Sequence, residues 1–369
     1  METLGIGIIG AGGISEGHGE SFARLKDKVT VMAFSDVDLD RASYRAEQFH
    51  APIATNTYEN LLKRDDIHII SICSPPGEHF QQIVDSLTAG KHVLCEKPVV
   101  LNLLQLDEIE ALVNKTGLCF GGAFQWRFGT SIQQLKDLHD QGLFGTIIYA
   151  TNNLFWHRTQ EYFDVPWRHS RAQSGGGIMF TLACHGLDAL IYVLGDIASV
   201  SAEVAALKYQ IEIEDTGAAI LRFANGAFGA INATVNAHQQ RSHLEIVGTK
   251  LEAISSDDPY GVAYAPWQFH SVDPHHERRV QQFLANPKYQ FEPASHRRLV
   301  EDFVQAVIEN RQPAIPVSEI RRSLQVLTAI YKSHRLGCKV ALPIEKSDPF
   351  YSSLNPNEFY GELAQMKSS

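Results

Sequence analysis

The chain has 369 residues, enough for about two domains, and its composition of 44% hydrophobic and 20% charged residues is typical of a globular protein. A formal net charge of −10 argues against nucleic acid as a partner, because such proteins present a basic face. No apolar run approaches the ~20 residues of a membrane span, and the first residues lack the basic segment of a secretory signal. Five scattered cysteines without a CxxC pair indicate reduced thiols. We therefore expect a cytoplasmic protein that binds neither nucleic acid nor a membrane.

The first third of the chain alternates apolar runs with helical segments. Five runs have the composition of buried strands: 6–9, 29–34, 67–72, 92–95 and 118–122. Helices are expected between them, over 39–49, 78–89 and 103–115. Near-continuous apolar strands that alternate with helices are typical of βαβ units. The pattern predicts an α/β domain with a parallel, doubly wound sheet over residues 1–124.

After residue 125 the pattern changes. A helix at about 131–141 is followed by strand-like runs at 146–156, 200–207, 218–223, 227–235 and 243–247. The Asn225-Gly226 pair between two of these runs predicts a hairpin, because both positions tolerate a positive φ. The segment 255–293, rich in Pro, His, Asp and Asn, is expected to form long surface loops before helices resume at 296–310 and 318–336. Hairpin-linked strands predict an α+β domain with a mainly antiparallel sheet over residues 125–369.

The first candidate motif is Gly10-Ala11-Gly12-Gly13-Ile14-Ser15, directly after the first strand. In dinucleotide-binding folds the first glycine forms a tight turn, the second admits the pyrophosphate and the third position needs a small residue, here Ser15. Asp36 ends the next strand, where a carboxylate would bind the ribose hydroxyls and repel the 2′-phosphate of NADP. Arg41 is the first arginine after it. The motif favours NAD over NADP; the alternative is a structural glycine turn beside an unrelated surface Asp.

The second candidate motif is Glu96-Lys97-Pro98, which ends the fourth strand. The carboxyl ends of parallel strands face the ligand crevice, so an ammonium there could meet a substrate hydroxyl. The alternative is a solvated Glu–Lys pair on a loop.

The third candidate motif is Ser174-Gly175-Gly176-Gly177, followed from Ile178 by an apolar stretch that is expected to be helical. Three glycines permit close approach of the backbone to a ligand or to a helix start. Thr181 and His185 are four residues apart, so we expect them on one helical face. Histidine is the usual general base near neutral pH. The alternative is a hydrogen-bonded core histidine.

These motifs, in this order, resemble the Gfo/Idh/MocA family of NAD(P)-dependent oxidoreductases over nearly the whole chain. The resemblance rests on four segments: Ser74-Pro75-Pro76-Gly77-Glu78-His79 together with Glu96-Lys97-Pro98, Gly175 to Asp188, Ile246-Val247-Gly248-Thr249-Lys250, and Glu301-Asp302-Phe303. It implies a Rossmann domain that holds the nicotinamide over a large, open, mainly antiparallel sheet of the second domain. It also implies that Lys97 lies at the reacting carbon and that His185 faces it as an acid or base, in roles that could be exchanged.

The resemblance further implies a set of binding residues. The expected cofactor contacts are Gly10, Gly12, Gly13, Ile14, Asp36, Ser74, Pro75, His79, Glu96, Lys97, Trp167 and Arg168. The expected substrate contacts are Lys97, Gln125, Arg127, Thr181 and His185. Thr181 stands where many sugar and cyclitol members carry an Asp, which removes a carboxylate that would accept substrate hydroxyls. No metal is implied: His270, His275 and His276 lie in the expected loop without the spacing of metal ligands.

The resulting hypothesis is an NAD-dependent dehydrogenase that acts on a secondary alcohol of a sugar, sugar derivative, glycoside or cyclitol. Two alternatives stay open: an NADP(H)-dependent reductase of a keto-sugar or imine, and a non-catalytic dinucleotide-binding regulator. The apolar strands between residues 218 and 235 would expose one face of an open sheet, and the resemblance implies that this face pairs two subunits in a homodimer or homotetramer.

Overall fold

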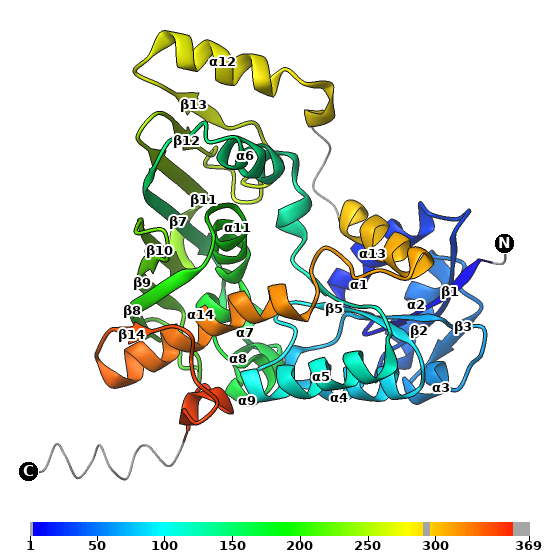
Figure 1. The fold of residues 1–369 in the computed structure, drawn as a ribbon. Coiled ribbons are helices and arrows are strands. Elements are labelled where there is room, and N and C mark those ends of the chain that lie inside the picture. Colours follow the sequence, from blue (N-terminus) through cyan, green and yellow to red (C-terminus); the bar gives the residue numbers. More distant parts are fainter. Residues whose placement is uncertain (1–2, 291–295, 357–369) are drawn as a thin grey trace, which may run out of the picture. The chain divides into compact units, whose positions relative to one another are not determined.

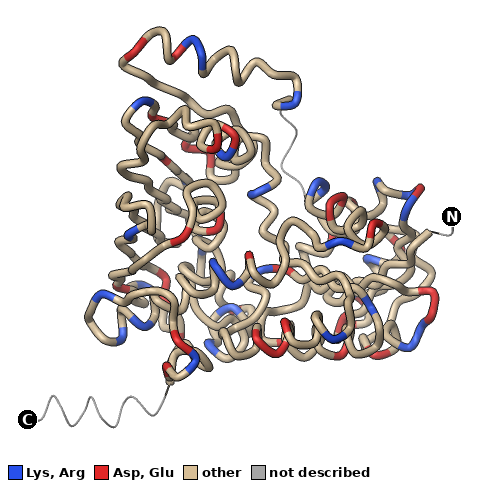
Figure 2. Tube along the Cα trace, in the orientation of Figure 1, with Lys and Arg blue, Asp and Glu red and all other residues tan. Residues whose placement is uncertain are grey.

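A computed structural model describes residues 3–290 and 296–356 (Figure 1). Within these ranges the chain forms two compact units, one of residues 3–125 with 296–321 and one of residues 126–290 with 322–356. The sequence-based division at residue 124 therefore differs from the structure for 296–321, which belongs to the first unit. Positions of Lys and Arg are interspersed with positions of Asp and Glu along the traces of both units (Figure 2).

The first unit contains a six-stranded parallel sheet with the order β3-β2-β1-β4-β5-β6. Its strands are β1 (Leu4–Ile9), β2 (Val29–Ser35), β3 (Ile53–Thr55), β4 (Ile69–Ile72), β5 (His92–Glu96) and β6 (Phe120–Ala123). This is the doubly wound order, in which ligands bind where the strand order reverses, here between β1 and β4. β4 is buried along its whole length, which explains why its residues are apolar apart from Ser71. The parallel α/β prediction is confirmed, although the short edge strand β3 was not predicted.

Helices connect these strands: α1 (Gly13–Ala23), α2 (Leu39–Gln48), α3 (Glu59–Leu62), α4 (Pro76–Thr88) and α5 (Leu103–Thr116), with α13 (Arg297–Glu309) added from the later part of the chain. Local signals place their ends. Asp38 caps α2 by accepting the N–H groups of Asp40 and Arg41. α4 begins with Pro76, where no N–H is needed. Asn102 caps α5, and Gly117 ends it with a φ of 69°.

The second unit contains an eight-stranded mixed sheet with the order β13-β12-β11-β7-β10-β9-β8-β14. Its strands are β7 (Ile147–His157), β8 (Ile197–Ala205), β9 (Thr216–Phe223), β10 (Phe228–Thr234), β11 (Asn236–Gly248), β12 (Glu252–Ile254), β13 (Gln268–His270) and β14 (Val340–Ala341). β7 and β10 are parallel and the other neighbours are antiparallel. The predicted hairpin joins β9 to β10, with Gly226 at a φ of 92°. Residues of β9 alternate between buried and exposed, so the sheet has one covered face and one open face.

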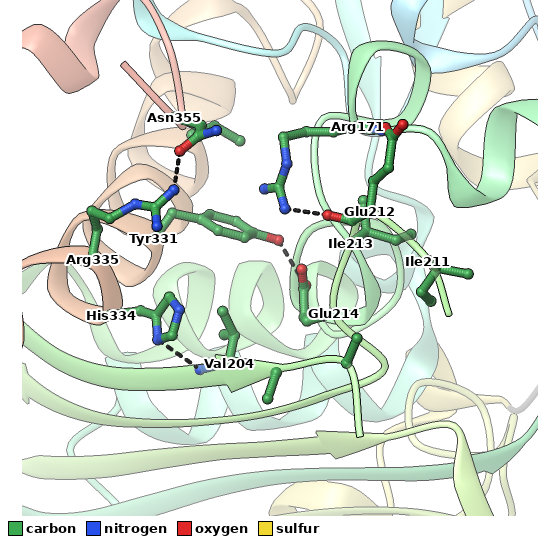
Figure 3. A pocket seen from close by; sticks show the side chains of 13 residues that line it. Arg171, Val204, Ile211, Glu212, Ile213, Glu214, Tyr331, His334, Arg335 and Asn355 are labelled. Atoms are coloured by element: carbon green, nitrogen blue, oxygen red, sulfur yellow. Dashed lines mark hydrogen bonds between the residues drawn. The ribbon is translucent and has the colours of Figure 1, made fainter. Parts of the chain in front are cut away.

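The helices of this unit are α6 (Thr130–Asp140), α7 (Gln160–Phe163), α8 (Pro166–His169), α9 (Arg171–Ser174), α10 (Ile178–Thr181), α11 (Cys184–Leu194), α12 (Pro274–Leu284) and α14 (Val317–Leu336), whose first residues belong to the first unit. Among the described residues, 3₁₀ turns occur at η1 (Gln125–Phe128), which begins with the last residue of the first unit before Trp126, at η2 (Pro287–Tyr289) and at η3 (Pro349–Tyr351). Tyr331 ties α14 to the chain before β9, because its hydroxyl donates to the Glu214 carboxylate at 2.7 Å (Figure 3).

Two expectations were wrong. The segment 255–293 is not a long loop in its described part, since it contains β13 and α12. Asp273 caps α12 by accepting the His275 N–H at 2.8 Å, and Pro274 is the first residue of the helix. An Asp followed by a Pro is a typical helix start, so the Asp and Pro residues of this segment include a helix signal.

The helix expected from Ile178 is also broken. The Ala183 N–H donates to the Ile178 carbonyl, five residues back, and the segments Arg171–Thr181 and Cys184–Leu194 meet at a bend of 54°. Thr181 and His185 therefore lie on two different helices and do not share one helical face. No single helix among the described residues is long and apolar enough to cross a membrane, although the bent pair Arg171–Thr181 and Cys184–Leu194 passes the same test by length and composition.

Candidate active site

The glycine turn after β1 packs tightly on one side and is open on the other. Gly10 has a φ of 90°, and a Cβ there would lie 2.6 Å from the main chain of Cys73. A Cβ on Gly12 or Gly13 would meet nothing within 4 Å. The third position is accommodated, because Ser15 is buried and its hydroxyl donates to the Gly12 carbonyl at 2.6 Å. Open space above the first N–H groups of α1 fits the pyrophosphate of a dinucleotide.

Asp36 follows β2 and lies against this turn. Its carboxylate accepts the Ala11 N–H at 2.8 Å and the Asp38 N–H at 3.0 Å. The exposed Arg41 guanidinium lies 3.1 Å from the same carboxylate. Ile14, in the first turn of α1, is exposed. The structure thus brings the predicted ribose-binding carboxylate to the glycine turn, and it adds a cation that sequence spacing alone did not place there.

The loop after β4 is tied to the loop after β5 by His79. Its ring is fully buried, and its two nitrogens lie 2.9 Å from the Pro98 carbonyl oxygen and 2.8 Å from that of Ser74. Burial lowers the pKa of His79, so the neutral ring donates to one of these oxygens at neutral pH. Pro75 forms the N-cap of α4. His79 and Pro75 therefore shape the loops at the sheet edge.

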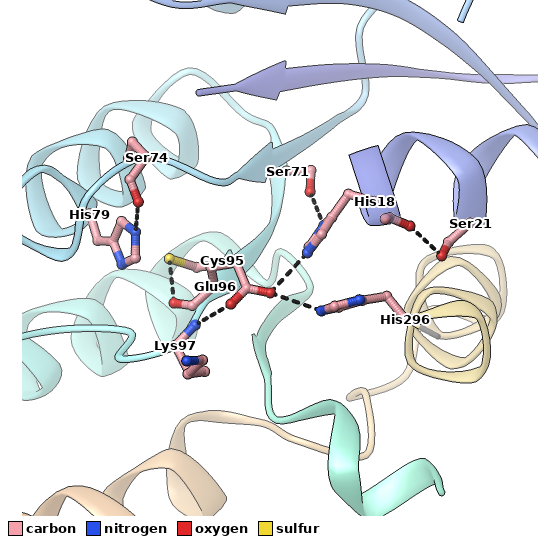
Figure 4. Close-up of polar contacts among 10 residues, drawn as sticks. His18, Ser21, Ser71, Ser74, His79, Cys95, Glu96, Lys97 and His296 are labelled. Carbon is pink, nitrogen blue, oxygen red and sulfur yellow. Dashed lines mark hydrogen bonds and ion pairs between the residues drawn. The ribbon is translucent and has the colours of Figure 1, made fainter. Parts of the chain in front are cut away.

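Glu96, at the end of β5, is held by two histidines from distant parts of the chain (Figure 4). His18 of α1 lies 3.0 Å from its Oε1 atom, and His296, which precedes α13, lies 3.2 Å from the same atom. The other oxygen accepts the Lys97 N–H at 3.2 Å. Burial acts to raise the pKa of Glu96, but hydrogen bonds from His18 and His296 outweigh it and hold the pKa well below its usual range. A buried, ionised carboxylate thus fixes the main chain of Lys97.

Sequence reasoning missed both histidines. The Nδ1 atom of His18 lies 2.8 Å from the Ser71 hydroxyl oxygen, and burial lowers the pKa of the His18 ring. The neutral ring therefore donates to Glu96 and accepts from Ser71, which satisfies both nitrogens. His18, Glu96 and His296 are close enough to ligate one metal ion, with their donor atoms within 4.8 Å of one another. Their contacts, however, are hydrogen bonds within one cluster, in which both histidines lie against the Glu96 carboxylate.

His185, at the start of α11, is buried against Trp126 with ring centroids 5.2 Å apart and an angle of 18°. Gln125, the last residue of the first unit before this Trp, begins η1. Arg127 forms a buried bidentate pair with Asp188 at 2.7 and 2.8 Å. Arg127 thus has a structural partner in Asp188, and its expected contact with the substrate stays a prediction.

The glycine motif before α10 packs against protein atoms. A Cβ on Gly177 would lie 1.9 Å from the Glu214 carbonyl oxygen, and one on Gly176 would lie 2.0 Å from the Tyr331 hydroxyl. The Glu214 carboxylate accepts the N–H groups of Gly177 at 2.9 Å and Met179 at 3.0 Å. The glycines therefore admit Glu214, which orients α10. Neither Glu214 nor Tyr331 was a candidate in the sequence.

A small cavity of the second unit brings three predicted residues together: Trp167, Arg168 and Thr181 all line it. The Arg168 guanidinium stacks over Tyr162, 4.2 Å from the ring centre. The Thr181 hydroxyl donates to the Gly177 carbonyl at 2.8 Å. The cavity thus joins the Trp-Arg pair to the end of α10, while the cofactor and substrate contacts expected of these residues stay predictions.

Comparisons with known proteins find matches to both parts of the chain. Residues 4–124 match the family model described as an oxidoreductase family with an NAD-binding Rossmann fold, and residues 132–253 match the GFO/IDH/MocA C-terminal domain. An uncharacterized oxidoreductase of Bacillus subtilis, YrbE, is 31% identical over 68% of this chain and 73% of its own length. Levoglucosan dehydrogenase of Pseudarthrobacter phenanthrenivorans is 23% identical over the same shares of the two chains.

A solved structure is similar over almost the full length. The WlbA dehydrogenase of Bordetella pertussis, in complex with NADH and UDP-GlcNAcA, superimposes with a TM-score of 0.82 at 26% identity. The alignment covers 94% of this chain and 99% of WlbA.

Proposed function

Because the chain belongs to the Gfo/Idh/MocA family of oxidoreductases and carries an NAD-binding Rossmann domain, we propose that it transfers a hydride between NAD and a secondary alcohol of a sugar, sugar derivative, glycoside or cyclitol. The observation that carries this proposal is the edge of the parallel sheet in the first unit. There the open glycine turn, Asp36 and the loop that begins with Lys97 follow β1, β2 and β5. The names of similar proteins, levoglucosan dehydrogenase and a dehydrogenase bound to UDP-GlcNAcA, support a carbohydrate substrate.

The residues of this chain would divide the work between binding and proton transfer. The glycine turn would hold the pyrophosphate and Asp36 the ribose, while bound NAD supplies the hydride acceptor. Lys97, whose main chain is fixed by Glu96, would stabilise the negative charge that develops on the substrate oxygen. His185 would accept the hydroxyl proton, with Trp126 holding its ring. Lys97 and His185 could also exchange these roles. Thr181 would orient a substrate hydroxyl.

A substrate panel followed by variants tests the proposal. Purified protein is assayed with NAD and with NADP against free sugars, glycosides and cyclitols, and against keto-sugars with the reduced cofactors. On the best substrate, Lys97→Ala and His185→Ala should each lose about 10²–10⁴ in kcat, the usual contribution of a positioned acid or base. Both should keep most of their NAD affinity in a fluorescence titration, since neither residue belongs to the glycine turn; Lys97, as an expected cofactor contact, should cause the larger of two small losses. Thr181→Ala should mainly raise KM.

The control is Lys115→Ala, which removes an exposed lysine at the end of α5 and should leave kcat unchanged. Near-normal kcat in Lys97→Ala would contradict the mechanism. Turnover with NADPH and a keto-sugar, but none with NAD and any alcohol, would favour the reductase. NAD binding without turnover of any compound would favour a regulator.

A further inference from the structure

The main chain around Lys97 is held from two sides. Before it, the Glu96 Oε2 atom accepts the Lys97 N–H at 3.2 Å (Figure 4). After it, the Pro98 carbonyl oxygen lies 2.9 Å from the Nδ1 atom of the buried His79 ring. The place of the Lys97 side chain therefore depends on how firmly these two buried side chains are themselves held.

The Glu96 carboxylate can hold the Lys97 N–H only while it does not rotate. Contacts to its other oxygen, Oε1, oppose this rotation: the Nε2 atom of His18 lies 3.0 Å away and that of His296 lies 3.2 Å away. The two histidine rings are neighbours, with centroids 4.9 Å apart. Glu96 is only 5% exposed, so water does not readily replace a lost contact.

His18 is oriented by the strand next to β5. Its ring is fully buried, and its Nδ1 atom lies 2.8 Å from the Ser71 hydroxyl oxygen on β4. Because burial lowers the pKa of His18, the ring is neutral and has one N–H to donate. A hydroxyl that donates to Nδ1 leaves that proton on Nε2, which faces Glu96. Ser71 thus selects the tautomer that holds the carboxylate.

His296 reaches the cluster from the segment that returns to the first unit. Its carbonyl oxygen accepts the Val300 N–H at 2.9 Å, which ties it to the first turn of α13. A Cβ on Gly17 of α1 would lie 3.3 Å from its Nδ1 atom, so the glycine leaves room for the ring beside α1. The returning segment therefore brings the second histidine to Glu96.

We propose that His18 and His296 are positioning residues that act through Glu96. They hold its carboxylate, which in turn fixes the main chain of Lys97 and so the place of the ammonium at the substrate oxygen. The inference rests on the role of Lys97 in the proposed function. A displacement of about 1 Å at a reacting group can cost about 10²-fold in rate, so a loosened carboxylate should lower kcat.

Steady-state kinetics of full-length variants on the best substrate test this inference. His296→Leu should lower kcat by about 10- to 100-fold and leave KM and NAD affinity nearly unchanged. His296→Gln should restore most of the wild-type kcat, because the amide nitrogen of glutamine can donate in place of Nε2. Ser71→Ala removes the hydrogen bond that orients His18 and should cause a smaller loss of kcat. Thermal unfolding identifies the folded variants, and Ser71→Ala carries the test if His296→Leu does not fold.

The matched control is His92→Leu, at the opposite end of β5 from Glu96. The His92 Nδ1 atom accepts the Cys119 N–H at 2.9 Å, so this variant also loses a hydrogen-bonded histidine and some stability. It should keep the wild-type kcat. Equal losses of kcat in His92→Leu and His296→Leu would overturn the inference, because lower stability would then explain both. Unchanged kcat in folded His296→Leu would also overturn it, as would failure of His296→Gln to restore kcat.

Lysine acetylation tests the same inference without a substrate. The full-length protein is treated briefly with acetic anhydride, and the acetylation of each lysine is measured by mass spectrometry. Relative to the exposed Lys115, Lys97 should react severalfold faster in His296→Leu than in the wild type, because a loosened side chain reaches the reagent more often. Lys91 reports general opening of the unit, since it is 7% exposed and its ammonium donates to a main-chain carbonyl at 2.7 Å. It should stay protected.

The two assays separate failure of this inference from failure of the proposed function. If no compound is turned over, the proposed function fails and acetylation alone decides. Faster acetylation of Lys97, with Lys91 protected, would then support the positioning role of His296. Equal acetylation of Lys97 in His296→Leu and the wild type would overturn it.

Discussion

Replacement of Asp36 by Ala is the sharpest test of the cofactor site, because it separates binding of the ribose from binding of the pyrophosphate. The carboxylate follows β2 and accepts the Ala11 N–H of the glycine turn at 2.8 Å, so it is already oriented before a dinucleotide arrives. Gly12 and Gly13 keep their open approach in the variant. The substitution therefore removes the group proposed to hold the ribose hydroxyls and leaves the space above Gly12 and Gly13 open, although the Ala11 N–H of the turn loses its acceptor.

The expected loss follows from the bonds that the carboxylate can form. A hydrogen bond to a charged group contributes about 1.5–3 kcal/mol. Two ribose hydroxyls would form two such bonds, but in the free protein Asp36 already contacts Arg41 at 3.1 Å, and part of the gain offsets that contact. A net loss of about 2–3 kcal/mol is reasonable, which corresponds to a roughly 30- to 150-fold higher Kd for NAD.

NADP should respond in the opposite direction. Its 2′-phosphate is repelled by the Asp36 carboxylate, and that repulsion disappears in the variant. Arg41, with its guanidinium exposed beside this position, then becomes a partner for the phosphate. We expect Asp36→Ala to bind NADP at least as tightly as the wild type does, and the double variant with Arg41→Ala to lose this gain.

Fluorescence titrations with NAD and NADP measure both effects. The matched control is Asp38→Ala, which removes a neighbouring carboxylate that caps α2 and also pairs with Arg41. It should lower stability by about 1 kcal/mol and leave NAD affinity nearly unchanged. Equal NAD affinity in Asp36→Ala and the wild type would refute the reasoning. So would a wild-type preference for NADP of about tenfold.

Three further predictions concern stability and assembly. Burial lowers the pKa of His18, so as the pH falls below 6.5 this residue binds a proton in the unfolded chain before it does so in the folded chain. The stabilisation from neutral His18 is therefore full above pH 6.5 and is lost on acidification. In urea denaturation, His18→Gln should make the unfolding free energy less dependent on pH between about 6.5 and 5, with a slope that corresponds to about one fewer bound proton at most. His296→Leu leaves the Glu96 carboxylate with one fewer hydrogen-bond donor and should lower the unfolding free energy by about 1.5–3 kcal/mol. The control His275→Leu replaces an exposed histidine and should lower it by less than about 0.5 kcal/mol. Equal losses in the two variants would contradict the role of His296 in the cluster. Ile220 is 61% exposed on the open face of the second sheet, so we expect the wild type to sediment as a homo-oligomer and Ile220→Glu to dissociate it; a monomeric wild type at micromolar concentration would refute this.

The part of the site that follows strands was predictable from the sequence. Gly10, Asp36 and Lys97 each come directly after a strand whose apolar residues predicted it. The carboxyl ends of parallel strands meet at one edge of the sheet, so the sequence was enough to predict that these residues lie near one another. The hairpin at Asn225-Gly226 was predictable for a similar reason, because its signal lies within two residues.

The remainder depended on contacts that leave no local pattern. His296 reaches Glu96 across 200 residues of sequence, and no spacing rule connects them. The break after Thr181 contains neither Pro nor Gly, and it arises from a hydrogen bond between Ala183 and Ile178 in a segment whose first turn is held by Glu214. Tertiary contacts therefore decided the direction of His185, while intrinsic preferences favoured one continuous helix.

The return of residues 296–321 to the first unit has a consequence for biosynthesis. Domains usually fold in order as they leave the ribosome, at ~5–20 residues per second. Here the parallel sheet is complete when residue 123 has been made, but α13 and His296 arrive only with the last quarter of the chain. The nascent sheet must therefore wait roughly 10–40 s with Glu96 only partly satisfied and one side of α1 uncovered. An N-terminal fragment that ends at residue 124 should accordingly be a client of chaperones, and co-expression of a second fragment that contains 296–321 should rescue its solubility.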